Sequence, residues 1–136
     1  MSNLDVIITR RSIRRYETRD IPQDVLQNIF EAGRQSPSAI NKQPIRFIAV
    51  TDKELKKFFS DVLFNRFIKD APVVLVGCAD VEALLTGKWA VIDTCIALEN
   101  MVIAAWSLGV GSCWIGAFNE EKIKKLLTIP ERWKIV

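Results

Sequence analysis

The chain has 136 residues, enough for one domain, and its 49% hydrophobic and 26% charged residues exclude a disordered polypeptide. Its net charge of +3 is too small to demand a polyanionic partner such as a nucleic acid. The absence of histidine excludes His-based acid–base catalysis, imidazole-containing triads and most zinc sites.

The three cysteines, Cys78, Cys95 and Cys113, are far apart and embedded in apolar segments, with no CxxC pair among them. This pattern predicts reduced, buried thiols rather than a disulfide framework or a metal site. The first five residues lack the apolar core of a secretory signal. We therefore expect a cytoplasmic protein that binds no metal.

The first half of the chain alternates helical and extended patterns. Apolar residues at helical spacing predict three helices, over residues 3–10, 21–33 and 53–63. Asp52 is the expected N-terminal cap of the third helix, which carries Leu63 at its end. A strand is predicted over residues 46–51, and a loop rich in Pro, Ser and Asn leads into it over residues 36–44.

In the second half, residues 72–79 form an almost uninterrupted apolar run, which predicts a strand in the middle of a sheet. A long apolar helix is predicted over residues 89–108, with Gly109 and Gly111 as left-handed caps. A strand near 112–115 and a helix over 119–127 complete the predicted elements. No strict βαβ repeat and no GxGxxG motif is present, so a dinucleotide-binding Rossmann half is not indicated.

The long helix is apolar around most of its circumference. Its exceptions Asp93, Asn100 and Ser107 recur every seven residues, and therefore form one polar stripe. The stripe could meet the polar edge of a neighbouring element, or the helix could lie at a subunit interface. We favour the interface, because a small domain has little material to cover such a helix on every side. A membrane span is disfavoured by Asp93, Glu99 and Asn100.

Three segments are candidate ligand sites. The run Arg10–Arg15 contains four arginines and Ser12, and suits a phosphate, although such a run is also common on a solvated face or a weak nucleic-acid patch. The loop 36–44 could hydrogen-bond the edge of a polar heterocycle or merely connect a helix to a strand. The segment 113–118 could be an ordinary core strand and its turn.

Together and in this order, these segments closely resemble the nitroreductase family of flavin enzymes. The resemblance covers nearly the whole chain. The blocks that carry it are Arg10-Arg11-Ser12, Ser36 to Pro44, Asp70-Ala71-Pro72, Ile92 to Met101 and Gly109 to Gly116. Chance agreement at so many separated blocks is improbable.

The resemblance implies an α+β fold, with a mostly antiparallel central sheet flanked by helices and a long buried central helix. It also implies a homodimer that binds FMN between its subunits. Relatives continue beyond the position of Val136 through a further strand and an arm. We therefore expect a single nitroreductase-like domain over residues 1–136 that lacks this C-terminal strand and arm.

The resemblance also implies roles for individual residues. The FMN phosphate and ribityl chain would be held by Arg10, Arg11 and Ser12. Arg14 would approach N1 and O2 of the flavin and tune it. The partner subunit would supply Ser38, Ala39 and Asn41, with Gln43 supporting their loop. The flavin ring would be lined by Trp114, Ile115 and Gly116, and hydrogen-bonded by Asn65.

The implied activity is an NAD(P)H-dependent oxidoreductase in which the flavin, and no catalytic side chain, carries the chemistry. Hydride would pass from NADH or NADPH through FMN to an electron-poor small molecule, such as a nitroaromatic or a quinone, by a ping-pong mechanism. No nucleic-acid or membrane partner is expected. Two alternatives stay open: a family relative with another flavin-dependent reaction, and a flavin-binding module without turnover.

Overall fold

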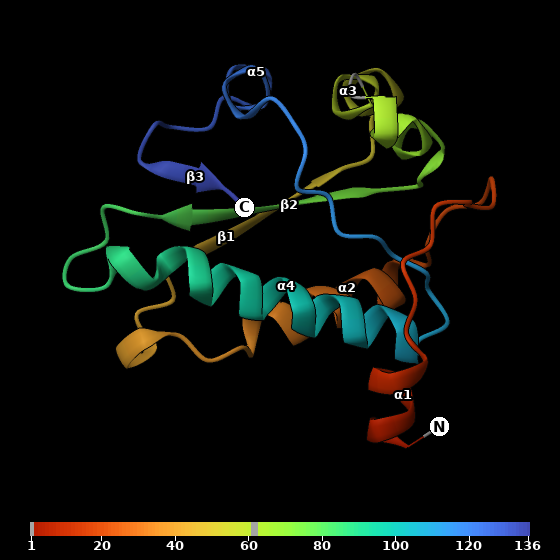
Figure 1. Cartoon of the computed structure of the whole chain (residues 1–136), viewed down its shortest axis with the longest axis horizontal. Helices are drawn as coiled ribbons and strands as arrows, with labels where there is room; N and C mark the ends of the chain where they lie inside the picture. The colour runs from red at the N-terminus through yellow and green to blue at the C-terminus, as the bar shows by residue number, and fades with distance from the viewer. Residues whose placement is uncertain (1, 61–62) are drawn as a thin grey trace.

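The computed structural model describes residues 2–60 and 63–136. Helices, 3-10 helices (η) and strands follow one another along the chain as shown in Figure 1. In order they are α1 (Asn3–Thr9), α2 (Gln23–Arg34), η1 (Ala39–Asn41), β1 (Ile45–Val50), α3 (Lys53–Phe59), η2 (Leu63–Asp70), β2 (Val74–Asp80), η3 (Gly87–Trp89), α4 (Ala90–Ser107), α5 (Glu120–Leu127) and β3 (Trp133–Ile135).

The sheet is antiparallel and has the strand order β1-β2-β3. Strand β2 lies in the middle, which confirms the prediction from its apolar run. It pairs with β1 along its length, from Ile45 opposite Ala79 to Val50 opposite Val74. Its pairing with β3 covers Cys78 to Asp80 only.

Two hydrophobic cores form on the two faces of the sheet, because successive residues of a strand face opposite sides. Figure 1 shows α3 and α5 on one side of the sheet and α2 and α4 on the other. Val76 and Cys78 belong to the core beneath α3 and α5, together with Val50, Phe59, Ile68, Ile123, Ile129 and Ile135. The second core contains Ile29, Met101 and Ala105, with Phe47, Leu75 and Leu98 packed against it.

Helix α4 is buried on one side and open on the other. Ala97, Met101 and Ala105 are buried in the core, whereas Ile92 and Ile96 are exposed. The segment Gly87–Ser107 is long and apolar enough to span a membrane by composition, a test that the core helix of a soluble protein also passes. Its packing against α2 and β2 accounts for its apolar character as that of a core helix.

The third predicted helix is wrong at its C-terminal end. Helix α3 ends at Phe59, and Leu63 belongs to the separate element η2, while residues 61 and 62 lie outside the described residues. Asp52 caps α3 as predicted, by accepting a hydrogen bond from the Leu55 N–H at 2.9 Å. The Ser60 hydroxyl donates to the Lys57 carbonyl at 2.7 Å, and such local side-chain bonds compete with continuation of a helix.

The predicted strand at 112–115 is also wrong. This segment makes a single parallel bridge, between Ser12 and Ser112. A ladder needs an extended neighbour, and the neighbour here is the irregular Arg10–Arg15 segment, which pairs at one residue only. The strand β3, near the C-terminus, was not predicted; it has only three residues, too few for a clear alternating pattern.

The two glycines after α4 have different roles. Gly109 adopts φ of 78°, as the predicted left-handed cap requires. Gly111 does not, so its assignment as a second left-handed cap is wrong. Instead, a Cβ at Gly111 would lie 2.7 Å from Cγ1 of Ile13, so the absence of a side chain permits a close approach of the two segments.

Candidate active site

The arginine turn, residues 10–15, is held between α1 and the segment that follows α4. Arg10 is the C-terminal cap of α1, and its N–H donates to the Val6 carbonyl. The Trp106 indole donates to the Thr9 hydroxyl at 3.1 Å, which ties α1 to α4. The Ile13 N–H donates to the Ser112 carbonyl at 2.8 Å. These contacts hold the backbone of the arginine turn at both ends.

Tyr16 provides a further anchor. Its hydroxyl donates to the Ile13 carbonyl at 2.8 Å, and its ring lies 6.2 Å from that of Phe67. Burial and the nearby Cys113 raise the pKa of Tyr16 to about 12, against a smaller opposing effect of Arg14. The phenol is therefore neutral at physiological pH and acts as a structural hydrogen-bond donor.

The polar side chains of the turn face solvent. Arg11, Ser12 and Arg14 are exposed, whereas Arg10 is half-buried. The Arg11 guanidinium donates to the backbone carbonyls of Ile8 and Arg10, at 3.0 and 2.8 Å. Guanidinium groups and a hydroxyl displayed together form a donor set suited to a phosphate.

Glu99, on α4, links the arginine turn to the segment 114–117. One of its carboxylate oxygens lies 3.9 Å from Nε of Arg10, and the other accepts a hydrogen bond from the Trp114 indole at 2.8 Å. Sequence reasoning missed this role, although Glu99 is one of only two acidic residues in α4 and was therefore detectable as an exception in an apolar helix.

The segment 114–117 forms one wall of the site. Trp114 is 39% exposed, and Ile115 packs against the first core. Apart from Gly116 and its two chain neighbours, no atom of the described residues lies within 4 Å of the position that a Cβ of Gly116 would take. Asn65 is 6% exposed and donates its side-chain N–H to the Ala117 carbonyl. The structure thus brings Asn65 to this segment, and leaves open space beside Gly116.

The loop Ser38–Gln43 has an unusual backbone. Ile40, Asn41 and Gln43 adopt φ values of 47°, 55° and 54°, in the left-handed region that a β-branched residue such as Ile rarely occupies. The Ser38 hydroxyl accepts from the Gln43 N–H at 2.9 Å, and the Gln43 amide donates to Oδ1 of Asn41 at 3.0 Å. Clusters of such backbone strain are typical of ligand-binding loops.

A single chain does not bring the two halves of the predicted site together. Figure 1 shows η1, which contains Ala39 and Asn41, beside the N-terminal end of α4. The arginine turn lies toward the other end of the same helix, with α1. The predicted residues therefore fall into two groups: Arg10, Arg11, Ser12, Arg14, Asn65, Trp114, Ile115 and Gly116 in one, and Ser38, Ala39, Asn41 and Gln43 in the other.

Comparison with known proteins identifies similar chains. A family model described as "Nitroreductase family" matches residues 7–70 and 59–136. A Methanothermobacter thermautotrophicus protein, provisionally named NADH dehydrogenase/NAD(P)H nitroreductase, is 37% identical over 137 residues, 96% of this chain and 71% of the relative. The FMN reductase [NAD(P)H] of Bacillus subtilis is 35% identical over 145 residues, 89% of this chain and 57% of that enzyme.

A solved structure has the same fold. The crystal structure of a nitroreductase family protein from Clostridium novyi NT superimposes with a TM-score of 0.93 and 34% sequence identity. The match covers 100% of this chain and 81% of that one. The α+β fold expected from the sequence is therefore confirmed.

Proposed function

Since the chain belongs to the Nitroreductase family, we propose that it is an FMN-dependent oxidoreductase that takes hydride from NADH or NADPH by a ping-pong mechanism. The acceptor is an electron-poor small molecule, such as a nitroaromatic or a quinone. One observation carries the proposal: the bridge from Ser12 to Ser112 places an exposed donor set suited to a phosphate beside the segment that leads into the open wall at residues 114–117. The names of the B. subtilis and M. thermautotrophicus relatives support the same class of activity.

The donor set and the wall would hold the two ends of FMN. Arg10, Arg11 and Ser12 would hold the phosphate, because guanidinium and hydroxyl donors suit its oxygens. The open space beside Gly116 leaves room for a planar ring against the backbone of the wall, and Trp114 and Ile115 immediately precede Gly116 in the sequence. FMN, when bound, supplies the centre that accepts and then donates hydride.

The side chains of this chain orient and tune rather than exchange protons. Tyr16, the neighbouring titratable group with a strongly shifted pKa, stays protonated. Arg14 would place a positive charge near N1 and O2 of the ring. A preference of about 1.4 kcal/mol for the reduced state raises a two-electron potential by about 30 mV.

We further propose a cytoplasmic homodimer with FMN between its subunits. In this arrangement the loop of one copy, with Ser38, Ala39 and Asn41 supported by Gln43, completes the site of the other copy. That copy contributes the arginine turn, Asn65 and residues 114–116. The separation of the two groups within one chain supports this arrangement. Exposed apolar residues on α1 and α4 support it as well: Leu4, Ile7, Ile8, Ile92 and Ile96.

Spectroscopy and affinity measurements test the proposal. The purified protein should show flavin absorbance after incubation with FMN, and NADH or NADPH should bleach it under anaerobic conditions. A protein that binds no FMN would contradict the cofactor assignment. A protein that binds FMN but is not bleached would be a flavin-binding module without turnover.

Substitutions in the arginine turn test the phosphate site directly. Arg10→Gln and Ser12→Ala should each weaken FMN binding about tenfold or more, given about 1.5 to 3 kcal/mol for a hydrogen bond to a charged group. Arg15→Gln is the matched control, because Arg15 is exposed in the same turn and carries the same charge. A loss of affinity in Arg15→Gln equal to that in Arg10→Gln would show a general charge effect and not a defined phosphate site.

A further inference from the structure

We propose that Asp93 is a positioning residue that holds the Ser38–Gln43 loop in the conformation with which it reaches the cofactor of a second subunit. The proposal rests on the proposed function for its ligand, FMN. Asp93 contacts the loop, and its proposed effect on the cofactor acts through the loop. It belongs to the polar stripe of the long helix.

The contact that motivates the proposal joins two distant parts of the chain. The Ala39 N–H donates to Oδ2 of Asp93 at 3.2 Å, across 54 positions of sequence. Asp93 is 5% exposed and lies in the first turn of α4. The positive end of the helix dipole favours a carboxylate there, so the acceptor can be both buried and charged.

The loop needs such an external contact because its own backbone is strained. Its three left-handed residues include Ile40, whose side chain is 75% exposed and therefore gains little from packing within the chain. The hydrogen bonds from Gln43 to Ser38 and Asn41 close the loop upon itself. Neither ties it to a helix, whereas the bond to Asp93 does.

The simpler explanation is that Asp93 only stabilises the start of α4. Substitution of the neighbouring residue Thr94 tests this explanation. This neighbour is fully buried, and its hydroxyl donates to the Ala90 carbonyl at 2.8 Å, within the same helix. Thr94→Val therefore removes a buried polar contact of α4 without touching the loop.

Limited proteolysis measures the loop directly. Lys42 is exposed within it, so trypsin cleavage after Lys42, followed by mass spectrometry on the flavin-free protein, reports how often the loop opens. We expect Asp93→Ala to speed this cleavage about tenfold or more, as loss of a hydrogen bond to a charged group predicts. Asp93→Asn, which keeps an acceptor oxygen, should restore most of the protection, and Thr94→Val should behave as wild type.

The donor side of the bond gives a second variant if Asp93→Ala does not fold. Ala39→Pro removes the N–H, and the extended conformation of Ser38, with φ of −139° and ψ of 158°, suits the residue before a proline. The effects of Asp93→Ala and Ala39→Pro on cleavage should not add in the double variant, because both substitutions remove the same hydrogen bond. Additive effects, or equal cleavage of Asp93→Ala and Thr94→Val, would overturn the proposal.

FMN titration tests the link to the cofactor. Asp93→Ala should weaken FMN binding at least fivefold, while Asp93→Asn and Thr94→Val stay within about twofold of wild type. An opened loop with unchanged FMN affinity would overturn the positioning role. If the wild-type protein binds no FMN, the proposed function fails, whereas the cleavage experiment still decides whether Asp93 holds the loop.

Discussion

At the scale of single residues, the carboxylate of Glu99 has two opposing effects on the proposed phosphate site. It fixes the Trp114 indole by accepting its hydrogen bond, and it also lies 3.9 Å from the Arg10 guanidinium, where a phosphate would compete for the same donor. The ion pair is half exposed, so solvent screening keeps its strength small. The charge and the acceptor oxygen can be separated by substitution.

We predict that Glu99→Gln binds FMN about 1.4- to fivefold more tightly than wild type, matching the roughly 0.2 to 1 kcal/mol that such a pair is worth. Gln keeps an oxygen for the Trp114 N–H, and removes only the competing charge. Isothermal titration with FMN measures the change. Glu54→Gln on α3 removes the same charge from a pair with Lys57, and should leave the affinity unchanged. Weaker binding by Glu99→Gln would show that its charge orients Arg10.

Gly111 gives a second prediction at this scale. Gly111→Ala would place a methyl group 2.7 Å from Cγ1 and 3.0 Å from Cβ of Ile13, which is branched and cannot swing aside freely. We expect a loss of about 1 to 3 kcal/mol in stability, as for other overpacked sites. Urea unfolding measures it. In the Ile13→Ala background, Gly111→Ala should cost less stability than it does in the wild-type protein. An equal cost in both backgrounds would exclude this clash as the cause.

Residue-level predictions from the sequence succeeded where chemistry is local. Gly109 follows an apolar helix, and a left-handed cap at that place depends on its immediate neighbours alone. Gly111, two residues later, is instead required by Ile13, a residue about a hundred positions away. Contacts of this kind depend on tertiary packing, so no local pattern could reveal them. The same holds for the bond between Ala39 and Asp93.

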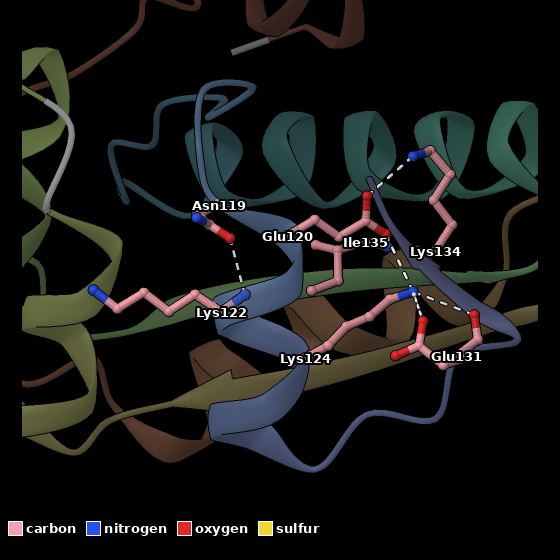
Figure 2. Close-up of polar contacts among 7 residues, drawn as sticks. All are labelled: Asn119, Glu120, Lys122, Lys124, Glu131, Lys134 and Ile135. Atoms are coloured by element: carbon pink, nitrogen blue, oxygen red, sulfur yellow. Dashed lines mark hydrogen bonds and ion pairs between the residues drawn. The ribbon is translucent and has the colours of Figure 1, made fainter.

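At the scale of elements, helix α5 and strand β3 are joined by a group of charged side chains, drawn in Figure 2. Glu120, in the first turn of α5, accepts from the Ile135 N–H at 3.0 Å and from the Lys134 ammonium at 3.1 Å. Lys124 lies 3.6 Å from Glu120 and 3.3 Å from the Glu131 carboxylate. Since β3 pairs with β2 over three residues only, these side-chain bonds supplement a short ladder.

The pH dependence of stability tests this group. Burial opposes ionisation of Glu120, but the N–H of Ile135 and the ammonium groups of Lys134 and Lys124 lower its pKa below the ordinary 4.5. A carboxylate with a lowered folded-state pKa stabilises the protein above its unfolded-state pKa, and this contribution is lost as the pH falls through the folded-state value. Glu120→Gln should therefore cost about 1 to 2 kcal/mol at pH 7 and progressively less below pH 4.5.

Urea denaturation of wild type and Glu120→Gln at pH 7 and at several lower values measures the difference. Glu121→Gln is the matched control, since Glu121 lies in the same first turn of α5 and is exposed. This control removes the same kind of interaction with the helix dipole as Glu120→Gln does, but it leaves the bonds between Glu120 and β3 intact. A deficit at pH 7 that is equal in both variants would assign the effect to the dipole alone.

Element predictions failed where an element depends on its neighbours. The apolar residues at 112–115 resemble a strand, but a strand exists only when an extended partner supplies the hydrogen bonds. The arginine turn pairs at Ser12 alone, so the segment stays irregular. Strand β3 shows the converse, because its three residues become a strand through pairing with β2. Strand β2, buried in the middle of the sheet, was predictable from its own composition.

At the scale of the whole molecule, the proposed site requires two chains, and the apolar residues left exposed suggest where they meet. Ile92 and Ile96 lie one turn apart on α4, and are 51% and 38% exposed. Leu4, Ile7 and Ile8 of α1 are also exposed, and α1 packs against α4. An apolar surface of this kind is typical of a homodimer interface.

We predict that Ile96→Glu converts the proposed dimer to a monomer, because two symmetry-related carboxylates would be buried without partners. FMN affinity should fall at least tenfold, although every proposed FMN ligand is still present in the chain. Light scattering measures the mass and fluorescence titration the affinity. Phe64→Glu, on η2 with an 81% exposed ring, introduces the same charge at an apolar residue away from α4, and should change neither. A monomeric Ile96→Glu that binds FMN as wild type does would show that one chain holds the whole site, and that the Ser38–Gln43 loop contributes nothing across the interface.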